Sequence, residues 1–455
     1  MMENLFKKSI FTTYVINDQH MLIVYNSMVG SSSIMKFDEN TSQQILKLFS
    51  RESITEHDGE RVPFWGRLVS RNIFVNVDRD ELRIAKTLLP GIIDSSTLNL
   101  CILPTGQCNY RCRYCYENFK LGRMSEEIQE GIIKFVRKNI HYYTGVNVSW
   151  FGGEPLLAAD IIDNLSSKLM AICNVSKRSY SASITSNGYL LDDIMLERLL
   201  NNRIYKIQIS LDGLKETNDY NKPLIDGSGT FDKIIDNIVK IRNNSSSHLF
   251  HIAIRTNFTH KSIKEFDDYL SYMKNIIGDD SRFSLFLRAV NDLGGEAVDE
   301  MQSQILSENE KENLYALTAS KKQQFYFTQH ESCLEPGGLV CYAGKKNDLI
   351  IQSDGTISKC SCALYSPVNK IGNVIPSGTF DIDWNIHSKW IMNSKLTNEC
   401  TQCCIMPLCF NLTCPASFIN ENDDDRKCPI EKDSLKDILV MLAKTKEIEV
   451  QQQKE

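Results

Sequence analysis

The chain lacks the features that mark a membrane-bound, secreted or nucleic-acid-binding protein. It has no apolar run long enough to cross a bilayer, and its N-terminal segment MMENLFKKSIFTTYVIND has no apolar stretch followed by a small-residue cleavage site. The 51 Lys and Arg residues are balanced by 57 Asp and Glu, without a basic block that would contact phosphates. We therefore expect a cytoplasmic protein with no nucleic-acid and no membrane partner.

Histidine is scarce in this sequence, whereas cysteine is abundant. There are eight histidines and fifteen cysteines. In a reducing cytoplasm these thiols do not form lasting disulfides, so metal or iron–sulfur ligation explains them better. The scarcity of histidine favours sites made of thiolates alone.

The length of 455 residues allows two or three domains with substantial cores. Residues 1–95 predict a small α+β unit, with short strands at 12–18, 20–26 and 33–37 and an amphipathic helix at 41–49. The alternative is a simple extension that packs on the main domain.

From residue 97 onward, apolar strand segments alternate with helical segments. The strand segments are 97–103, 146–151, 180–186, 204–210, 250–258 and 282–290. Strands separated by helices predict parallel βαβ units. We therefore expect an α/β fold, a partial (β/α)6 TIM-like barrel over residues 96–290, with its chemistry at the C-terminal ends of the strands.

Three segments follow the predicted barrel. Residues 291–332 predict a polar helical connector, and residues 333–430 a cysteine-rich domain with too few apolar runs to order itself without metal. Residues 431–455 predict a closing helix and a polar tail.

The segment CNYRCRYC carries Cys108, Cys112 and Cys115 directly after the first barrel strand. A tetrahedral zinc site or a fully ligated cubane cluster takes four protein thiolates, so three would leave one iron open. Taken alone, the spacing also fits an incidental metal knuckle.

With Tyr114 before its last cysteine, this motif resembles that of the radical S-adenosylmethionine (SAM) enzymes, and the resemblance extends over residues 97–430. It implies that the three cysteines hold a [4Fe-4S] cluster whose open iron binds SAM. Reductive cleavage of SAM then yields a 5'-deoxyadenosyl radical. Tyr114 would belong to the SAM site.

Four further motifs at successive strand ends match the same family: FGGEP, TSNG, SLDG and RTN. The resemblance implies that one group of residues holds the SAM amino group: Gly152, Gly153 and Glu154. It places Ser186 and Asn187 in the SAM site, Ser210 at the methionyl carboxylate or ribose, and Arg255 in the adenosine pocket. Relatives often carry arginine near Lys222, which counts against Lys222 as a carboxylate clamp.

The cysteine-rich end resembles the SPASM extension, which holds two auxiliary clusters in radical SAM enzymes that act on peptides and proteins. The resemblance implies a first auxiliary [4Fe-4S] cluster on Cys333, Cys341, Cys360 and Cys414, and a second on Cys400, Cys403, Cys409 and Cys428. The link between Cys409 and Cys414 is one residue longer than the family usually has, and Cys362 or Cys404 could replace a neighbouring ligand. One or two structural zinc sites are the alternative.

The N-terminal unit is similar to the winged-helix-like leader-recognition element of peptide maturases, which binds a leader as an added strand. This resemblance implies a ribosomally made precursor peptide with a leader as substrate, an intramolecular thioether or carbon–carbon cross-link as product, and an electron donor such as flavodoxin or ferredoxin. No general acid or base is predicted.

Two alternatives stay open. One is an anaerobic sulfatase-maturating enzyme that forms formylglycine, although Ser361 follows Cys360 where such relatives carry an aspartate base. The other is a non-catalytic iron–sulfur or zinc scaffold that binds a peptide.

Overall fold

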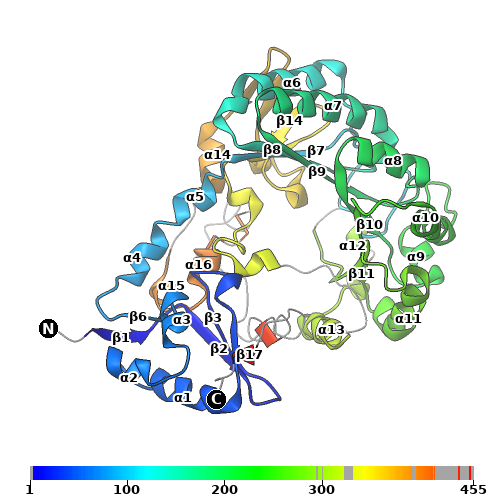
Figure 1. The fold of residues 1–455 in the computed structure, drawn as a ribbon. Coiled ribbons are helices and arrows are strands. Elements are labelled where there is room, and N and C mark those ends of the chain that lie inside the picture. The colour runs from blue at the N-terminus through cyan, green and yellow to red at the C-terminus, as the bar shows by residue number, and fades with distance from the viewer. Residues whose placement is uncertain are drawn as a thin grey trace. The chain divides into compact units, whose positions relative to one another are not determined.

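In the computed structural model, the chain folds into two compact units (Figure 1). The first unit combines Met1–Ser95 with Gln329–Lys346 and Lys389–Glu455, and the second combines Ser96–Thr328 with Asn347–Ser388. The structure describes residues 4–293, 296–299, 301–321, 331–391, 396–412, 414–415, 439–440 and 450–451. Within these ranges no helix is both long enough and apolar enough to cross a membrane.

Two small sheets organise the N-terminal part of the first unit. In one, β3 (Leu22–Asn26) pairs antiparallel with β2 (Thr12–Ile16) and β4 (Met35–Phe37), and β17 (Val450–Gln451) lies parallel to β4. In the other, β1 (Leu5–Lys8) lies between β5 (Ile54–Thr55) and β6 (Phe74–Asn76). The helices are α1 (Glu39–Phe49), α2 (Glu56–Glu60), α3 (Trp65–Ser70), α4 (Glu81–Lys86) and α5 (Leu89–Ile93).

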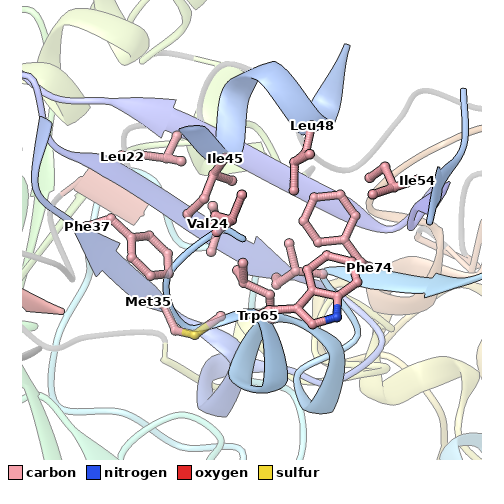
Figure 2. Packing of buried hydrophobic residues seen from close by; sticks show 12 residues of the cluster. Leu22, Val24, Met35, Phe37, Ile45, Leu48, Ile54, Trp65 and Phe74 are labelled. Atoms are coloured by element: carbon pink, nitrogen blue, oxygen red, sulfur yellow. The ribbon is translucent and has the colours of Figure 1, made fainter. Parts of the chain in front are cut away.

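The core of this N-terminal part forms where α1 covers β3 (Figure 2). Asp38 caps α1 by accepting a hydrogen bond from the Thr41 amide at 2.8 Å, which satisfies one of the free donors of the first turn. The helix then packs Ile45 against Leu22 and Val24 of β3. The strands at 12–16, 22–26 and 35–37 and the helix at 39–49 agree with the predicted pattern.

The second unit is built on a ten-stranded sheet whose larger part is parallel. Six of its parallel strands follow chain order: β7 (Thr97–Ile102), β8 (Gly145–Trp150), β9 (Ser179–Ser186), β10 (Ile204–Ser210), β11 (His251–Phe258) and β12 (Phe283–Ala289). Each pairs in parallel with the next, as crossover helices require. The predicted α/β class and six-stranded partial barrel are therefore confirmed.

Helices that connect these strands lie along the outer face of the curved sheet (Figure 1). They are α6 (Glu126–Asn139), α7 (Ala159–Val175), α8 (Asp193–Asn201), α9 (Lys215–Asn221), α10 (Phe231–Asn244) and α11 (Phe266–Ile277). Side-chain caps set the starts of two of them: Ser125 and Asp192 accept backbone amides at the first turns of α6 and α8.

The parallel sheet continues into strands that the periodicity did not predict. β13 (Asp348–Ile351) pairs in parallel with β7, and antiparallel strands β14 (Thr356–Ser358), β15 (Lys370–Ile375) and β16 (Thr379–Ile382) follow. These strands have three to six residues, too short for an alternating pattern to stand out.

The predicted connector contains α12 (Glu296–Asp299) and α13 (Glu308–Ser320). The cysteine-bearing segments contain the short helices η6 (Glu331–Leu334), η7 (Tyr342–Gly344), α14 (Trp384–Ile391), α15 (Asn398–Thr401) and α16 (Met406–Cys409). The predicted closing helix lies outside the described residues except for Leu439 and Val440.

Candidate active site

The loop that carries Cys108, Cys112 and Cys115 leaves the C-terminal end of β7, as predicted. Backbone hydrogen bonds tie it to the end of α9 and the residues that follow: the Arg113 amide donates to the carbonyl of Asn221, the last residue of α9, and the Arg111 amide to the Pro223 carbonyl, both at 2.9 Å. Cys108 is buried, and all three thiols are outside any disulfide. The loop is thus ordered by the protein itself and keeps three thiols available as ligands.

Two glycines after β8 pack closely against the start of this loop. Gly152 has φ +108°, and a Cβ there would lie 2.8 Å from the Thr105 carbonyl oxygen. A Cβ on Gly153 would lie 2.3 Å from the Gln107 carbonyl oxygen, which no side chain tolerates. Both glycines therefore permit close backbone packing beside the cysteine loop.

Glu154 follows these glycines and is fully buried. Its carboxylate accepts hydrogen bonds from the Ser186 hydroxyl at 2.8 Å and the Asn187 amide at 2.7 Å. The Leu156 amide donates a third at 3.0 Å, to the same oxygen as Ser186. Because a carboxylate offers about four acceptor positions, one remains on Oε2 for a further donor. Burial raises the pKa of this carboxyl, and the hydrogen bonds and the Lys222 charge oppose the rise.

Asn187 joins the β9 end to the cysteine loop. Its side-chain amide donates to Asn109 Oδ1 at 2.7 Å and lies 3.9 Å from Cys108 Sγ. Its own Oδ1 accepts the Tyr189 amide at 3.0 Å. Ser186 and Asn187 are thus both brought into the predicted site, where they hold Glu154 and the Cys108 turn.

Tyr114 belongs to a buried polar network that the sequence did not predict. Its hydroxyl donates to Asp212 Oδ2 and accepts from Asn257 Nδ2 at 3.2 Å. The other oxygen of Asp212, which is fully buried, accepts the Asn257 amide at 3.1 Å. Burial, followed by the Asp212 charge, raises the pKa of Tyr114, so the hydroxyl keeps its proton and remains a donor. Both partners stand in the SLDG and RTN motifs, which was the available signal.

We expect Tyr114→Phe to lower the free energy of unfolding by about 2 kcal/mol, because it removes a donor from a buried carboxylate. Chemical denaturation of the metal-free protein measures this change. The matched control is Tyr205→Phe on β10, a partly exposed tyrosine that should stay within about 0.5 kcal/mol of the wild type. Equal stability of the two variants would show that the network contributes nothing.

Lys222, which the sequence disfavoured as a carboxylate clamp, is buried beside the site. It is 1% exposed, and its ammonium donates to the Ser210 carbonyl at 2.7 Å and to the Ser210 hydroxyl. Burial raises the pKa of the Cys112 thiol, and the nearby Lys222 charge opposes this rise. The structure therefore places a buried cation beside Cys112 and Glu154, held by the predicted site residue Ser210.

Arg255 lies on β11, directly opposite Ser210 in the sheet register. Its Nε donates to Asn257 Oδ1 at 2.9 Å, and its guanidinium lies 6.0 Å from the Phe286 ring centre. The hydrogen bond with Cys360 lowers the pKa of the Cys362 thiol to about 6, and the Arg255 charge adds to this effect. Arg255 thus contacts the strand-end residue Asn257 and acts through its charge on the turn that carries Cys360 and Cys362.

Asn369 holds the Cys360 turn, although no sequence signal marked it. It is fully buried, and its Oδ1 accepts the amides of Lys359 at 3.0 Å and Cys360 at 2.8 Å. Its amide group donates to the carbonyls of Cys360 and Ala363, both at 2.8 Å. All four hydrogen-bonding positions are used, so the turn is shaped without metal.

The remaining described cysteines of the cysteine-rich region, other than Cys360 and Cys362, belong to the first unit. Cys333 lies in η6, Cys341 precedes η7, Cys400 lies in α15 and Cys409 ends α16. The Cys403 amide donates to the Cys400 carbonyl at 3.1 Å, and Thr397 Oγ1 donates to Cys400 Sγ at 3.3 Å. Cys414 is described and exposed, whereas Cys428 lies outside the described residues. The assignment of eight thiolates to two clusters remains a prediction.

Among the described residues, no three His, Cys, Asp or Glu side chains converge on a single point as ligands of one metal ion do. A cubane cluster does not require such convergence, since each of its thiolates binds a different iron.

Comparison with known proteins identifies the class. Residues 102–270 match the radical SAM superfamily. These residues therefore form a radical SAM domain, and this superfamily uses SAM with a [4Fe-4S] cluster. This finding confirms the resemblance on which the cysteine loop was interpreted.

The chain is 23% identical over 339 residues to the serine-type anaerobic sulfatase-maturating enzyme of Klebsiella pneumoniae. The aligned residues cover 70% of this chain and 82% of that enzyme. It is 35% identical over 151 residues to GTP 3',8-cyclase of Clostridium botulinum, covering 30% of this chain and 40% of that one.

Two solved structures share the fold. One is anSMEcpe with bound AdoMet and the Cp18Cys peptide, with TM-score 0.59, 19% identity and coverage of 77% of this chain and 98% of that one. The other is Streptococcus suis SuiB bound to precursor peptide SuiA, with TM-score 0.51, 17% identity and coverage of 93% and 99%.

Proposed function

We propose that this enzyme matures a precursor peptide by closing an intramolecular thioether or carbon–carbon cross-link. The 5'-deoxyadenosyl radical would take one hydrogen atom from the peptide, a second hydrogen would leave as a proton, and the remaining electron would pass to an auxiliary iron–sulfur cluster. The extent of the likeness to SuiB carries the proposal. The SuiB match covers 93% of this chain. The uncovered remainder is shorter than the segment 1–95, so the match includes part of that segment. The anSMEcpe match, at 77%, leaves enough uncovered to omit the segment entirely.

The N-terminal sheet suits a peptide partner. β2 stands at the end of its sheet in the described part of the chain, and such an edge presents unpaired amides and carbonyls. An extended leader would add there through main-chain hydrogen bonds, which bind a peptide without demanding a particular sequence. The leader would then tether the core of the peptide to the enzyme.

The residues at the strand ends fit a SAM-binding cluster. Cys108, Cys112 and Cys115 would ligate three irons and leave the fourth for SAM. SAM carries an ammonium and a carboxylate on its methionyl end: Glu154 offers one acceptor position for the ammonium, and Lys222 offers a buried cation for the carboxylate. Bound together, cluster and SAM would supply the radical that abstracts hydrogen.

The chain's own contribution to this chemistry is position and exclusion of water. Gly152 and Gly153 bring backbone close to the start of the cysteine loop, and the hydrogen bond from Tyr114 to Asp212 holds the loop near Cys115. Because Glu154 and Asp212 are fully buried, their hydrogen bonds act in a medium of low dielectric constant, where they are stronger than in water.

We extend the proposal to two auxiliary [4Fe-4S] clusters in the cysteine-rich region, with flavodoxin or ferredoxin as electron donor. Eight thiolates suffice for both clusters. Structural zinc remains the competing assignment for this region, and measurement of iron and zinc separates the two.

Maturation of a sulfatase by formylglycine formation is the second candidate. It is favoured by the match to the Klebsiella pneumoniae enzyme over 82% of that protein. Against it, the residue after Cys360 is Ser361, whose hydroxyl is a far weaker base than a carboxylate.

Anaerobic reconstitution with SAM and a chemical reductant tests the proposal. We expect about twelve irons per chain, formation of 5'-deoxyadenosine, and a mass loss of two hydrogens on a short peptide encoded beside the gene. An aldehyde-reactive hydrazide separates the candidates, since formylglycine reacts with it and a cross-link does not. Absence of 5'-deoxyadenosine would refute the radical chemistry, and a hydrazide-reactive product would refute the cross-link.

A further inference from the structure

Strand β3 of the N-terminal sheet is buried on both faces. Successive side chains of a strand point to opposite sides, so Leu22 and Val24 face one core and Ile23 and Tyr25 face another. The first core is the one under α1 (Figure 2). The second is closed by residues far away in the sequence: Leu334, Ile405, Leu408 and Leu439.

Cysteines of the cysteine-rich region pack against this second core. They are Cys333, Cys403 and Cys404. Cys333 and Cys403 are predicted cluster ligands, and Cys404 was considered as a substitute ligand. Ile23 and Tyr25 are fully buried against these segments. The N-terminal sheet and the cysteine segments of the first unit therefore share one apolar core.

Two hydroxyls of the sheet bind the turns that carry these cysteines. Tyr25 Oη donates to the carbonyl of Leu334, the residue after Cys333, at 2.6 Å. Ser27 Oγ donates to the carbonyl of Cys404 at 2.5 Å. Tyr25 and Ser27 are both fully buried, so each hydrogen bond satisfies a carbonyl that water does not reach from that side.

The turn after β3 adds a third connection. The Ser31 amide donates to a carboxylate oxygen of Glu335 at 3.1 Å. Gly30 has φ +84°, and a Cβ there would lie 2.1 Å from Glu335 Oε2. The absence of a side chain at Gly30 is thus what allows Glu335 to reach the turn. The segment after Cys333 is therefore fixed at Leu334 and at Glu335.

We propose that Tyr25 and Ser27 are positioning residues for the auxiliary clusters. Through the carbonyls of Leu334 and Cys404, the N-terminal sheet holds in place the turns that carry the cysteine ligands. This inference rests on the auxiliary clusters of the proposed function. Groups one step behind the ligands orient them and tune the metal, and their loss typically weakens metal retention about 10- to 100-fold. The N-terminal sheet, which we propose binds the leader, and the turns that ligate the auxiliary clusters are therefore structurally coupled in this chain.

The test is a Tyr25→Phe, Ser27→Ala double variant of the full-length reconstituted enzyme. Tyr25→Phe keeps the ring in the core and removes only the hydroxyl. We expect about tenfold faster loss of iron to an anaerobic chelator and a changed auxiliary-cluster electron paramagnetic resonance spectrum. Formation of 5'-deoxyadenosine should persist, because the SAM site belongs to the second unit.

Matched controls separate position from general stability. Tyr14→Phe on β2 and Ser32→Ala beside Ser31 remove the same groups from partly or fully exposed side chains, and both should leave iron retention and spectrum unchanged. A Tyr25→Phe, Ser27→Thr double variant keeps a hydroxyl at position 27. It should therefore retain iron as well as the Tyr25→Phe single variant does.

Iron content distinguishes the two ways in which the idea can fail. About twelve irons in the wild type with the same retention and spectrum in the double variant would refute the positioning role alone. About four irons in the wild type would refute the auxiliary clusters, and this inference with them.

Discussion

Replacing Cys112 with alanine is expected to reduce the formation of 5'-deoxyadenosine to background. Three thiolates of the β7 loop are the predicted ligands of the SAM-binding cluster, and a cubane left with two protein ligands is not retained. Cys112 is the central one of the three, and its loop is held by the backbone contacts of Arg111 and Arg113. The alanine variant should therefore fold normally and lack about four irons per chain.

The measurement is an iron count together with 5'-deoxyadenosine formed from SAM and reductant. Cys173→Ala is the matched control, because Cys173 is a buried thiol of α7 with 1% exposure. It should cost about 1 kcal/mol of stability from lost packing and leave iron and product unchanged. If Cys112→Ala still cleaved SAM reductively, the ligand assignment would be wrong.

Lys222→Met is expected to raise the dissociation constant of SAM about 100-fold. The physical reason is that a buried ammonium facing a carboxylate is worth about 2–5 kcal/mol when one partner is removed. Methionine fills a similar volume without charge, but it leaves the two Ser210 oxygens without their lysine donor. The variant should therefore lose affinity and also lower the free energy of unfolding by about 1–3 kcal/mol, and titration of the folded enzyme separates the two effects.

Isothermal titration of the reconstituted enzyme with SAM measures this effect. Lys359→Met provides the control: Lys359 is also fully buried in the second unit and donates to the Asp348 carbonyl at 2.7 Å. It should leave SAM affinity unchanged. A loss of stability without a loss of affinity in Lys222→Met would show that Lys222 serves only to hold Ser210.

Much of the site followed from the sequence because its signals are local. The spacing of Cys108, Cys112 and Cys115 and the glycines before Glu154 are short motifs that mean the same wherever the chain folds. The six barrel strands were apolar segments separated by helical ones, so their order in the sheet followed from connectivity. The structure places Ser186, Asn187 and Glu154 together, as the motifs suggested.

Lys222 and Asp212 illustrate what sequence reasoning did not reach. The arginine that relatives often carry near Lys222 counted against this lysine in the sequence, and only the packing of α9 behind the cysteine loop shows that it is buried. Asp212 belongs to the SLDG motif, which we interpreted through Ser210 alone. Its hydrogen-bond donor Tyr114 is 98 residues away in the sequence.

By itself, the sequence determined the class of chemistry and the parallel barrel, because ligand spacing and hydrophobic periodicity act over a few residues. The tertiary structure alone decided that β13–β16 extend the barrel sheet, and that the N-terminal sheet shares a core with cysteines more than three hundred residues away. Both depend on pairing between distant segments. Such pairing is set by which surfaces can be buried together, a property that no local pattern records.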